Sequence, residues 1–149
     1  MFIRHILFGT LLGLSGLLHA NDIVGVWKTI DDQTGYSRGD VTVIKNADGT
    51  YSGKLTAIRP LPYKPLVKVC EKCKGKLKNT SLVGLEIIQG FKQDSQNPLE
   101  YNGGTVLDPL SGNVYKGKIK LNETGKRLSM RGYIGVSALG RNTTWIRAD

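Results

Sequence analysis

Short stretches of alternating apolar and polar residues, each ending in a turn, are the feature that most limits how this chain can fold. The clearest lies between residues 114 and 121, where Tyr115, Gly117, Ile119 and Leu121 alternate with three lysines. A period of two is typical of a strand with one buried and one solvated face. About eight such strands follow residue 22, with Gly, Asn, Asp and Pro at the turns between them. Because consecutive hairpins dominate and closure removes both sheet edges, we predict an all-β fold of about eight antiparallel strands in a closed barrel.

The alternation fails between residues 59 and 80. This stretch contains three of the five prolines and both cysteines of the chain, and prolines at this density prevent a central strand. We predict a long loop that flanks one end of the barrel. Residues 81–90 are apolar on both faces and predict a buried strand, whereas the polar residues 91–102 predict a loop.

The N-terminus has the pattern of a signal peptide. Arg4 is followed by an apolar stretch that is too short and too rich in glycine for a membrane span, and Ala20 offers a small residue for cleavage. We predict a signal peptide at residues 1–20 and a single domain at residues 21–149. The mature protein is expected to be periplasmic or secreted, with no membrane span; an uncleaved anchor is the alternative.

Histidine is confined to the predicted signal peptide, as His5 and His19. A mature chain without histidine lacks Ser-His-Asp and Cys-His catalysis and cannot ligate a metal through imidazole. We therefore predict that the protein is not an enzyme, has no catalytic residues and binds no metal or cofactor.

The two cysteines form one Cys-x-x-Cys motif, Cys70 and Cys73. Outside the cytoplasm these thiols are expected to pair, so we predict a disulfide that stiffens the proline-rich loop. A structural zinc site would need further ligands. The alternative is a redox-active pair, as in disulfide-exchange enzymes, although those enzymes place the first cysteine at a helix N-terminus.

Strand parity places aromatic and basic residues of the two terminal strands on common faces. Trp27 lies on the first strand, and Trp145 shares a face with Arg147 on the last. If these strands pair to close the barrel, the Arg147 guanidinium can lie over the Trp27 indole. We predict structural roles for Trp27, Trp145 and Arg147. The alternative is that Arg147 meets the anionic end of a ligand.

These residues are part of a wider set of motifs. A Gly-x-Trp on the first strand and a basic residue near the C-terminus resemble lipocalin-like barrels. With the other motifs, they resemble the exported bacterial family called domain of unknown function 2147. The resemblance implies a lipocalin-like barrel outside the cytoplasm, without an established ligand or activity. The motifs are Gly25-Val26-Trp27, Cys70-Glu71-Lys72-Cys73-Lys74-Gly75, Gly103-Gly104-Thr105-Val106-Leu107-Asp108-Pro109 with Gly112 and Tyr115, and Leu128-Ser129-Met130-Arg131-Gly132-Tyr133-Ile134-Gly135 leading through Gly140-Arg141 to Trp145 and Arg147.

The inner face of such a barrel can hold a small molecule. Arg131 shares a face with Tyr133 and Arg141 with Trp145, and an arginine beside an aromatic ring can grip a carboxylate or phosphate. The alternative is that both arginines face outward and are solvated, because parity does not say which face is inside. We predict an exported soluble barrel that binds a small amphipathic or anionic molecule. A barrel filled by its own side chains is the alternative. The predicted ligand-binding residues are Arg131, Arg141, Tyr51, Leu55, Tyr115, Ile119 and Met130.

The chain is basic, with a formal net charge of +9 at pH 7. Its lysines are spread along the chain, so we interpret the charge as a solvated cationic surface. A basic exported protein can also meet an anionic component of the envelope. The alternative function is therefore an envelope interaction or structural protein that acts through its basic surface. No nucleic-acid partner is expected, because no binding motif is present.

Overall fold

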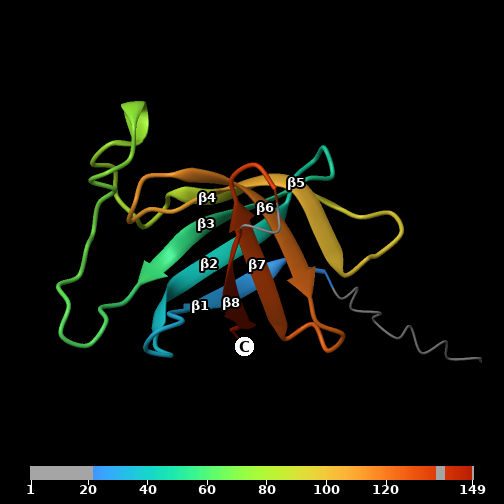
Figure 1. Cartoon of the computed structure of the whole chain (residues 1–149), viewed down its shortest axis with the longest axis horizontal. Helices are drawn as coiled ribbons and strands as arrows, with labels where there is room; N and C mark the ends of the chain where they lie inside the picture. Colours follow the sequence, from blue (N-terminus) through green and yellow to red (C-terminus); the bar gives the residue numbers. More distant parts are fainter. Residues whose placement is uncertain (1–21, 137–139, 149) are drawn as a thin grey trace, which may run out of the picture.

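The computed structural model describes residues 22–136 and 140–148, so the predicted signal peptide at residues 1–20 lies outside the described residues. The described chain forms a closed barrel in which each antiparallel strand pairs with the next and β8 pairs with β1 (Figure 1). The predicted fold is confirmed. Among the described residues, no helix is long and apolar enough to cross a membrane. The elements are β1 (Gly25–Ile30), β2 (Ser37–Lys45), β3 (Tyr51–Ile58), the short 3-10 helix η1 (Gly75–Leu77), β4 (Glu86–Gln93), β5 (Glu100–Leu107), β6 (Val114–Leu121), β7 (Arg127–Tyr133) and β8 (Arg141–Arg147).

The alternation in the sequence matches the two faces of the barrel wall. In β6, Gly117 and Ile119 are buried, whereas the lysines between the inner residues are exposed. In β3, Tyr51 and Leu55 are buried on the same inner face. The inward side chains of the strands meet in one core. A barrel with a packed interior and a wet exterior therefore explains the period of two.

β4 and β5 differ from the prediction. The loop expected over residues 91–102 is wrong, because Phe91 is fully buried in β4 and β5 begins at Glu100. A Cβ atom at Gly104 or Gly117 would overlap the Phe91 ring, so two glycines on neighbouring strands make space for it. The strand predicted over residues 81–90 starts too early, because β4 begins only at Glu86.

Trp27 and Arg147 close one end of the barrel. They are directly opposed in the pairing of β1 with β8, and the Arg147 guanidinium lies 4.3 Å from the centroid of the Trp27 ring. The guanidinium also donates hydrogen bonds to the backbone carbonyls of Asp22, Val24 and Gly125, at 2.6, 2.7 and 2.7 Å. The contact expected from strand parity is confirmed, and its partners are those of a structural plug.

The half of the barrel next to this plug is filled with side chains. The rings of Tyr51 and Tyr101 meet edge to face, with centroids 5.1 Å apart and planes at 86°. Phe91 and Ile119 are fully buried with them. Burial raises the pKa of Tyr101 to about 12, because the phenolate would lose its hydration there.

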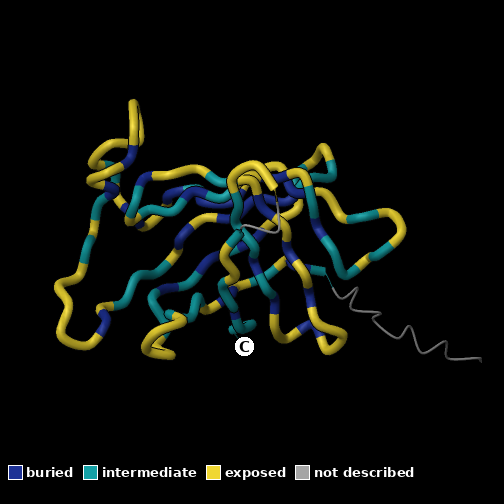
Figure 2. Tube along the Cα trace, in the orientation of Figure 1, coloured by how far each residue is buried: buried dark blue, intermediate teal, exposed yellow. Residues whose placement is uncertain are grey.

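The opposite end of the barrel carries the longest connection, residues 59–85, which extends beyond the wall (Figure 1). The amide of Asn79 donates to the carbonyl of Cys70 at 2.8 Å, and the amide of Cys70 donates to Thr80 at 2.9 Å. The predicted disulfide between Cys70 and Cys73 is present beside these hydrogen bonds, at the base of the loop tip, and both residues are buried. The loop tip is exposed above this buried base (Figure 2).

Candidate ligand-binding site

A cavity of about 850 Å³ opens at the end of the barrel opposite the plug. Its floor is apolar and comes from inward residues of the wall, including Leu55, Ile87, Met130 and Trp145. The proline-rich loop flanks it with Pro60, Leu61, Pro65, Leu66 and Val67. The volume lies within the range of about 300–1,000 Å³ typical of small-molecule sites.

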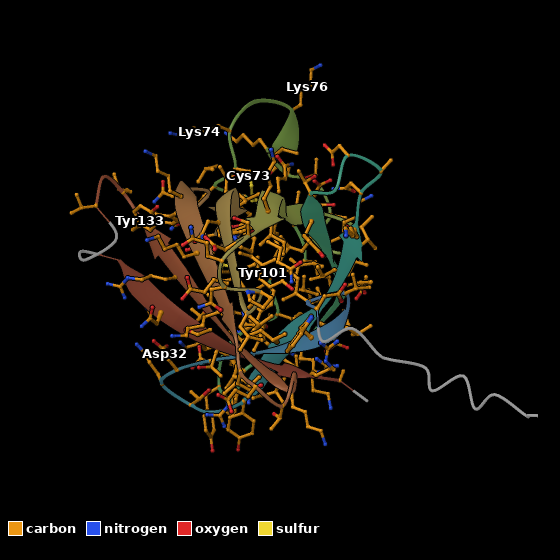
Figure 3. All side chains as sticks on the ribbon, turned by 90° about the vertical axis from the view of Figure 1, so that its right-hand side faces the viewer. Asp32, Cys73, Lys74, Lys76, Tyr101 and Tyr133 are labelled. Carbon is orange, nitrogen blue, oxygen red and sulfur yellow. A yellow bond between two sulfur atoms is a disulfide. The ribbon has the colours of Figure 1, made fainter. Side chains whose placement is uncertain are left out.

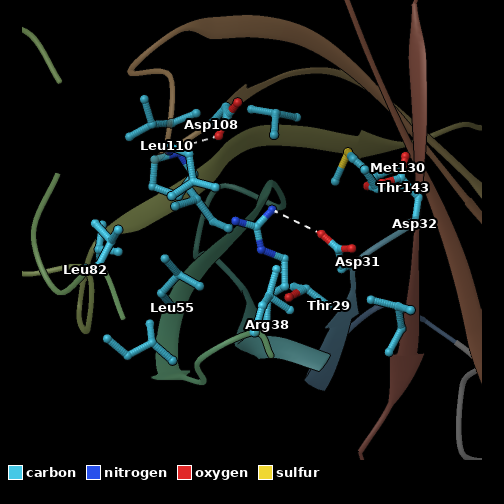
Figure 4. A pocket seen from close by; sticks show the side chains of 18 of the residues that line it. Thr29, Asp31, Asp32, Arg38, Leu55, Leu82, Asp108, Leu110, Met130 and Thr143 are labelled. Atoms are coloured by element: carbon cyan, nitrogen blue, oxygen red, sulfur yellow. Dashed lines mark hydrogen bonds and ion pairs between the residues drawn. The ribbon is translucent and has the colours of Figure 1, made fainter. Parts of the chain in front are cut away.

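The guanidinium of Arg38 reaches into this cavity. Arg38 lies at the start of β2, where the pairing of β1 with β2 shifts so that Ile30 faces Ser37 and Thr29 faces Gly39. Such a bulge turns the extra residue away from the regular alternation. Figure 4 shows Arg38 rising between Leu55 and Asp31 among the lining side chains.

Asp31 is the ion-pair partner of Arg38, but the contact is long, at 3.7 Å between Nη1 and Oδ2. The other carboxylate oxygen of Asp31 accepts hydrogen bonds from the amides of Gln33 and Thr34 and from the Thr34 hydroxyl. The hydroxyl of Thr34 is the main cause that lowers the pKa of Asp31. The turn therefore holds Asp31 in place independently of Arg38.

Two further arginines on the rim have closer partners. Arg141 Nη2 lies 2.7 Å from Asp32 Oδ2 in an exposed pair that joins β8 to the turn after β1. Arg59 holds Asp40 through two hydrogen bonds, at 2.7 and 2.8 Å. The hydrogen bond from Arg59 is the main cause that lowers the pKa of Asp40. These pairs fix the rim, whereas Arg38 has the loosest pairing of the three.

The predicted ligand-binding residues separate into two groups. Leu55, Tyr115, Met130 and Arg141 line the cavity. Tyr51 and Ile119 face inward as predicted, but they are buried in the filled half of the barrel and do not line the cavity. Arg131 also lies outside the cavity lining.

Arg131 is opposite Lys118 and Asn142 in the strand register. Lys118 is on the exposed face of β6, so this register places Arg131 on the outer face of the wall. Its Nη1 donates to Asn142 Oδ1 at 3.0 Å. The assignment of Arg131 to a ligand site therefore does not agree with its place in the barrel.

The sequence analysis did not predict Arg38 as a ligand-binding residue, because strand parity places it on the outer face of the barrel. Gly39, Val41 and Val43 alternate as the buried residues of β2, so a regular strand would turn Arg38 to the solvent. The sequence signal for its position is the turn Asp-Asp-Gln-Thr-Gly at residues 31–35. The first aspartate of this turn can form an ion pair with a basic residue that follows in the same hairpin.

The cysteines and acidic residues of the described chain do not form a metal centre. Within residues 22–136 and 140–148, no group of three or more His, Cys, Asp or Glu side chains is placed to hold a metal ion. Cys70 and Cys73 have 0% and 3% of their surface exposed. Reactive thiols are found in partly exposed, electropositive surroundings, so this burial gives no support to thiol exchange.

A closed antiparallel barrel with a plug at one end and an apolar cavity at the other defines the class of lipocalin-like barrels. The chain belongs to the family described as "Uncharacterized protein conserved in bacteria (DUF2147)", whose family model matches residues 25–147. The solved structure of protein HP1028 from Helicobacter pylori, described as belonging to the lipocalin family, matches with a TM-score of 0.70. The identity is 18%, over 86% of this chain and 84% of that chain, which shows the fold alone. No curated protein matches the sequence.

Proposed function

We propose that this barrel binds a small amphipathic molecule, with its apolar part in the cavity and an anionic head group at Arg38. The lipocalin-like fold and the size of the cavity support a binding role. The observation that carries the choice of an anionic head group is the Arg38 guanidinium, which lies at the charged mouth of a cavity with an apolar floor and has a long ion pair to Asp31.

The donors of Arg38 suit a carboxylate, sulfonate or phosphate. A guanidinium offers five N–H groups in a planar fork that fits two oxygens at once. Among the described residues, the Arg38 guanidinium has one ion-pair partner, Asp31 at 3.7 Å, which is beyond hydrogen-bond distance. The hydrogen bonds that Asp31 accepts within the turn do not involve Arg38. A ligand can therefore bind Arg38 without breaking them.

A binding role also fits the location that we propose, which is the periplasm or the outside of the cell. The buried disulfide between Cys70 and Cys73 supports an oxidising compartment. The signal peptide at residues 1–20 and the domain at residues 21–149 stay predictions. N-terminal sequencing of protein recovered from the periplasm or the medium tests them, and a sequence that begins at residue 1 contradicts them.

Native mass spectrometry of protein purified without detergent from its own compartment tests the proposed function. We expect a reproducible extra mass that is released on denaturation. Two fluorescent probes refine the test: 8-anilinonaphthalene-1-sulfonate, which has an apolar body and an anionic head, and N-phenyl-1-naphthylamine, which lacks the sulfonate. Saturable binding of the first probe at one site per barrel is expected. A bare protein that binds neither probe contradicts the proposal.

A further inference from the structure

Basic residues occur along the whole chain, but most of its net positive charge lies in one loop, because that loop has few acidic residues. Residues 59–85 carry seven basic residues and one acidic residue, a net charge of +6, whereas the whole chain has +9. Arg59 is engaged by Asp40. The other basic residues of the loop are exposed lysines, and none has an ion pair in the described part of the chain: Lys64, Lys68, Lys72, Lys74, Lys76 and Lys78.

Exposed apolar side chains gather at the same end of the barrel. In an antiparallel barrel of this topology, alternate connections lie at the same end. The connections at residues 31–36, 59–85 and 108–113, together with residues 134–136, surround the cavity. Nine of the twelve large exposed hydrophobic side chains of the described chain are in them or at the adjoining strand start: Tyr36, Tyr63, Leu66, Leu77, Val83, Leu110, Val114, Ile134 and Val136.

The opposite end differs in both respects. Its three connections, residues 46–50, 94–99 and 122–126, have one basic residue, Lys126, and three acidic residues, Asp48, Asp94 and Glu123. Of the large exposed hydrophobic residues of the described chain, none lies in these connections, and three lie at the adjoining ends of β1 and β2: Val24, Val26 and Ile44. The two ends of the barrel therefore differ in charge and in exposed apolar surface, and the cavity opens at the basic, apolar end.

The basic tip of the loop is held in a fixed place. Cys70 and Cys73 tie its base together, and the backbone of Lys72 packs so closely on Gly112 that a Cβ atom there would overlap it. Lys74 and Lys76 extend away from the barrel on this tip (Figure 3), with Leu77 exposed beside them in η1. The charges thus project together beyond the barrel wall.

We propose that this end of the barrel docks on an anionic lipid bilayer. The lysines of residues 59–85 contact the head groups, and exposed side chains such as Leu77 and Ile134 enter the interface. Basic residues combined with exposed apolar side chains are the chemistry that binds anionic membrane surfaces. The docking does not depend on what the cavity holds, although it would place the mouth against a source of amphipathic molecules.

A bilayer explains this surface better than an acidic protein partner does. Lysine is a hydrated point charge on a flexible stem, which suits head groups that move in a fluid plane, whereas ordered carboxylates favour arginine. The loop has six lysines and one arginine, and that arginine is already occupied by Asp40. The apolar side chains come from four separate connections, so they surround the mouth rather than form one flat patch.

Cosedimentation with vesicles tests the proposal. The purified protein is mixed with vesicles of phosphatidylcholine alone and of phosphatidylcholine with phosphatidylglycerol, over a series of salt concentrations. We expect binding only to the anionic vesicles, and weaker binding as salt rises. Replacement of Lys74, Lys76 and Lys78 by glutamine should lower the partition coefficient about a hundredfold at low salt, since each lysine near an anionic surface contributes roughly fivefold.

The matched control replaces Lys118, Lys120 and Lys126 by glutamine. Lys118 and Lys120 lie on the exposed face of β6, and Lys126 is exposed in a connection at the opposite end of the barrel. This variant loses the same charge away from the docking end, so at about 0.1 M salt its partition coefficient should change by less than about threefold, because charges beyond a Debye length of about 10 Å are screened. Equal losses in the two variants overturn the proposal, since net charge alone would then explain the binding. Absence of binding to anionic vesicles also overturns it, and leaves a protein or polymer as the partner of this end. Probe binding in solution is measured separately, so its failure is distinguishable from a failure to dock.

Discussion

The guanidinium of Arg147 lies over the indole of Trp27, 4.3 Å from the ring centroid, where the last strand of the barrel meets the first. This contact joins the two ends of the described chain and closes the barrel on the side away from the cavity. The same guanidinium binds three backbone carbonyls. One side chain therefore contributes both to closure of the sheet and to the packing of its end.

Replacement of Arg147 by alanine should reduce stability and leave ligand binding unchanged. The variant loses a cation–π contact and leaves three carbonyls without their donors, which we expect to lower the free energy of unfolding by about 2–4 kcal/mol. Urea denaturation measures this loss. Arg147→Lys should recover only part of it, because an ammonium cannot reach three carbonyls in a planar fork. A variant of wild-type stability that no longer binds the sulfonate probe would contradict the structural role.

Replacement of Arg38 by methionine should weaken binding of the anionic probe specifically. Methionine keeps most of the apolar stem but removes the donors, so the affinity for 8-anilinonaphthalene-1-sulfonate should fall about tenfold or more, as for loss of a charged hydrogen bond. Binding of N-phenyl-1-naphthylamine should change little. Fluorescence titration measures both. Arg131→Met is the matched control, because Arg131 lies outside the cavity lining; an equal loss there would remove the special role of Arg38.

Replacement of Gly112 by alanine should destabilise the protein more than replacement of Gly35, which has the same backbone φ. Gly112 and Gly35 both have φ of +73°, but an added Cβ meets the Lys72 carbonyl at Gly112 and nothing within 4 Å at Gly35. Gly35→Ala should cost about 1–2 kcal/mol for the left-handed conformation alone. Gly112→Ala should cost about 1–3 kcal/mol more, because the overlap forces the loop base to move. Thermal denaturation compares the two variants, and equal losses would show that the loop does not pack as described.

The pair of Asp40 and Arg59 should stabilise the barrel only above acidic pH. The hydrogen bond from Arg59 lowers the pKa of Asp40 in the folded protein, so the contribution is present above the unfolded carboxyl pKa of about 4 and is lost as pH falls through the lowered value. Asp40→Asn should therefore lower the free energy of unfolding at pH 7 by about 0.2–1 kcal/mol, the usual range for a partly exposed pair.

Urea denaturation at pH 7 and at progressively lower pH checks this prediction. The difference between the wild type and Asp40→Asn should shrink as Asp40 is protonated. Arg59→Met should show the same pH dependence, and the double variant should add little to either single one. A difference that is constant with pH would mean that Asp40 contributes by packing or by a neutral hydrogen bond instead.

The period-two pattern was sufficient to predict the barrel and the faces of its most regular strands. In β6, inward Ile119 and outward Lys118 follow from alternation alone, because a strand with one wet face reveals its orientation locally. Trp27 and Arg147 could be placed together from parity once closure was assumed. The disulfide between Cys70 and Cys73 also followed from residues close in sequence.

Depth along the barrel and departures from alternation were decided only by the tertiary structure. Tyr51 and Leu55 share an inner face, yet Tyr51 packs against Tyr101 in the filled half while Leu55 lines the cavity. Phe91 is buried because Gly104 and Gly117 leave room for its ring. Arg38 enters the cavity because the pairing of β1 with β2 shifts beside it. The alternation of a strand is a local property and can be read from the sequence, whereas these positions depend on which residues of other strands lie opposite, and that is set only when the barrel closes.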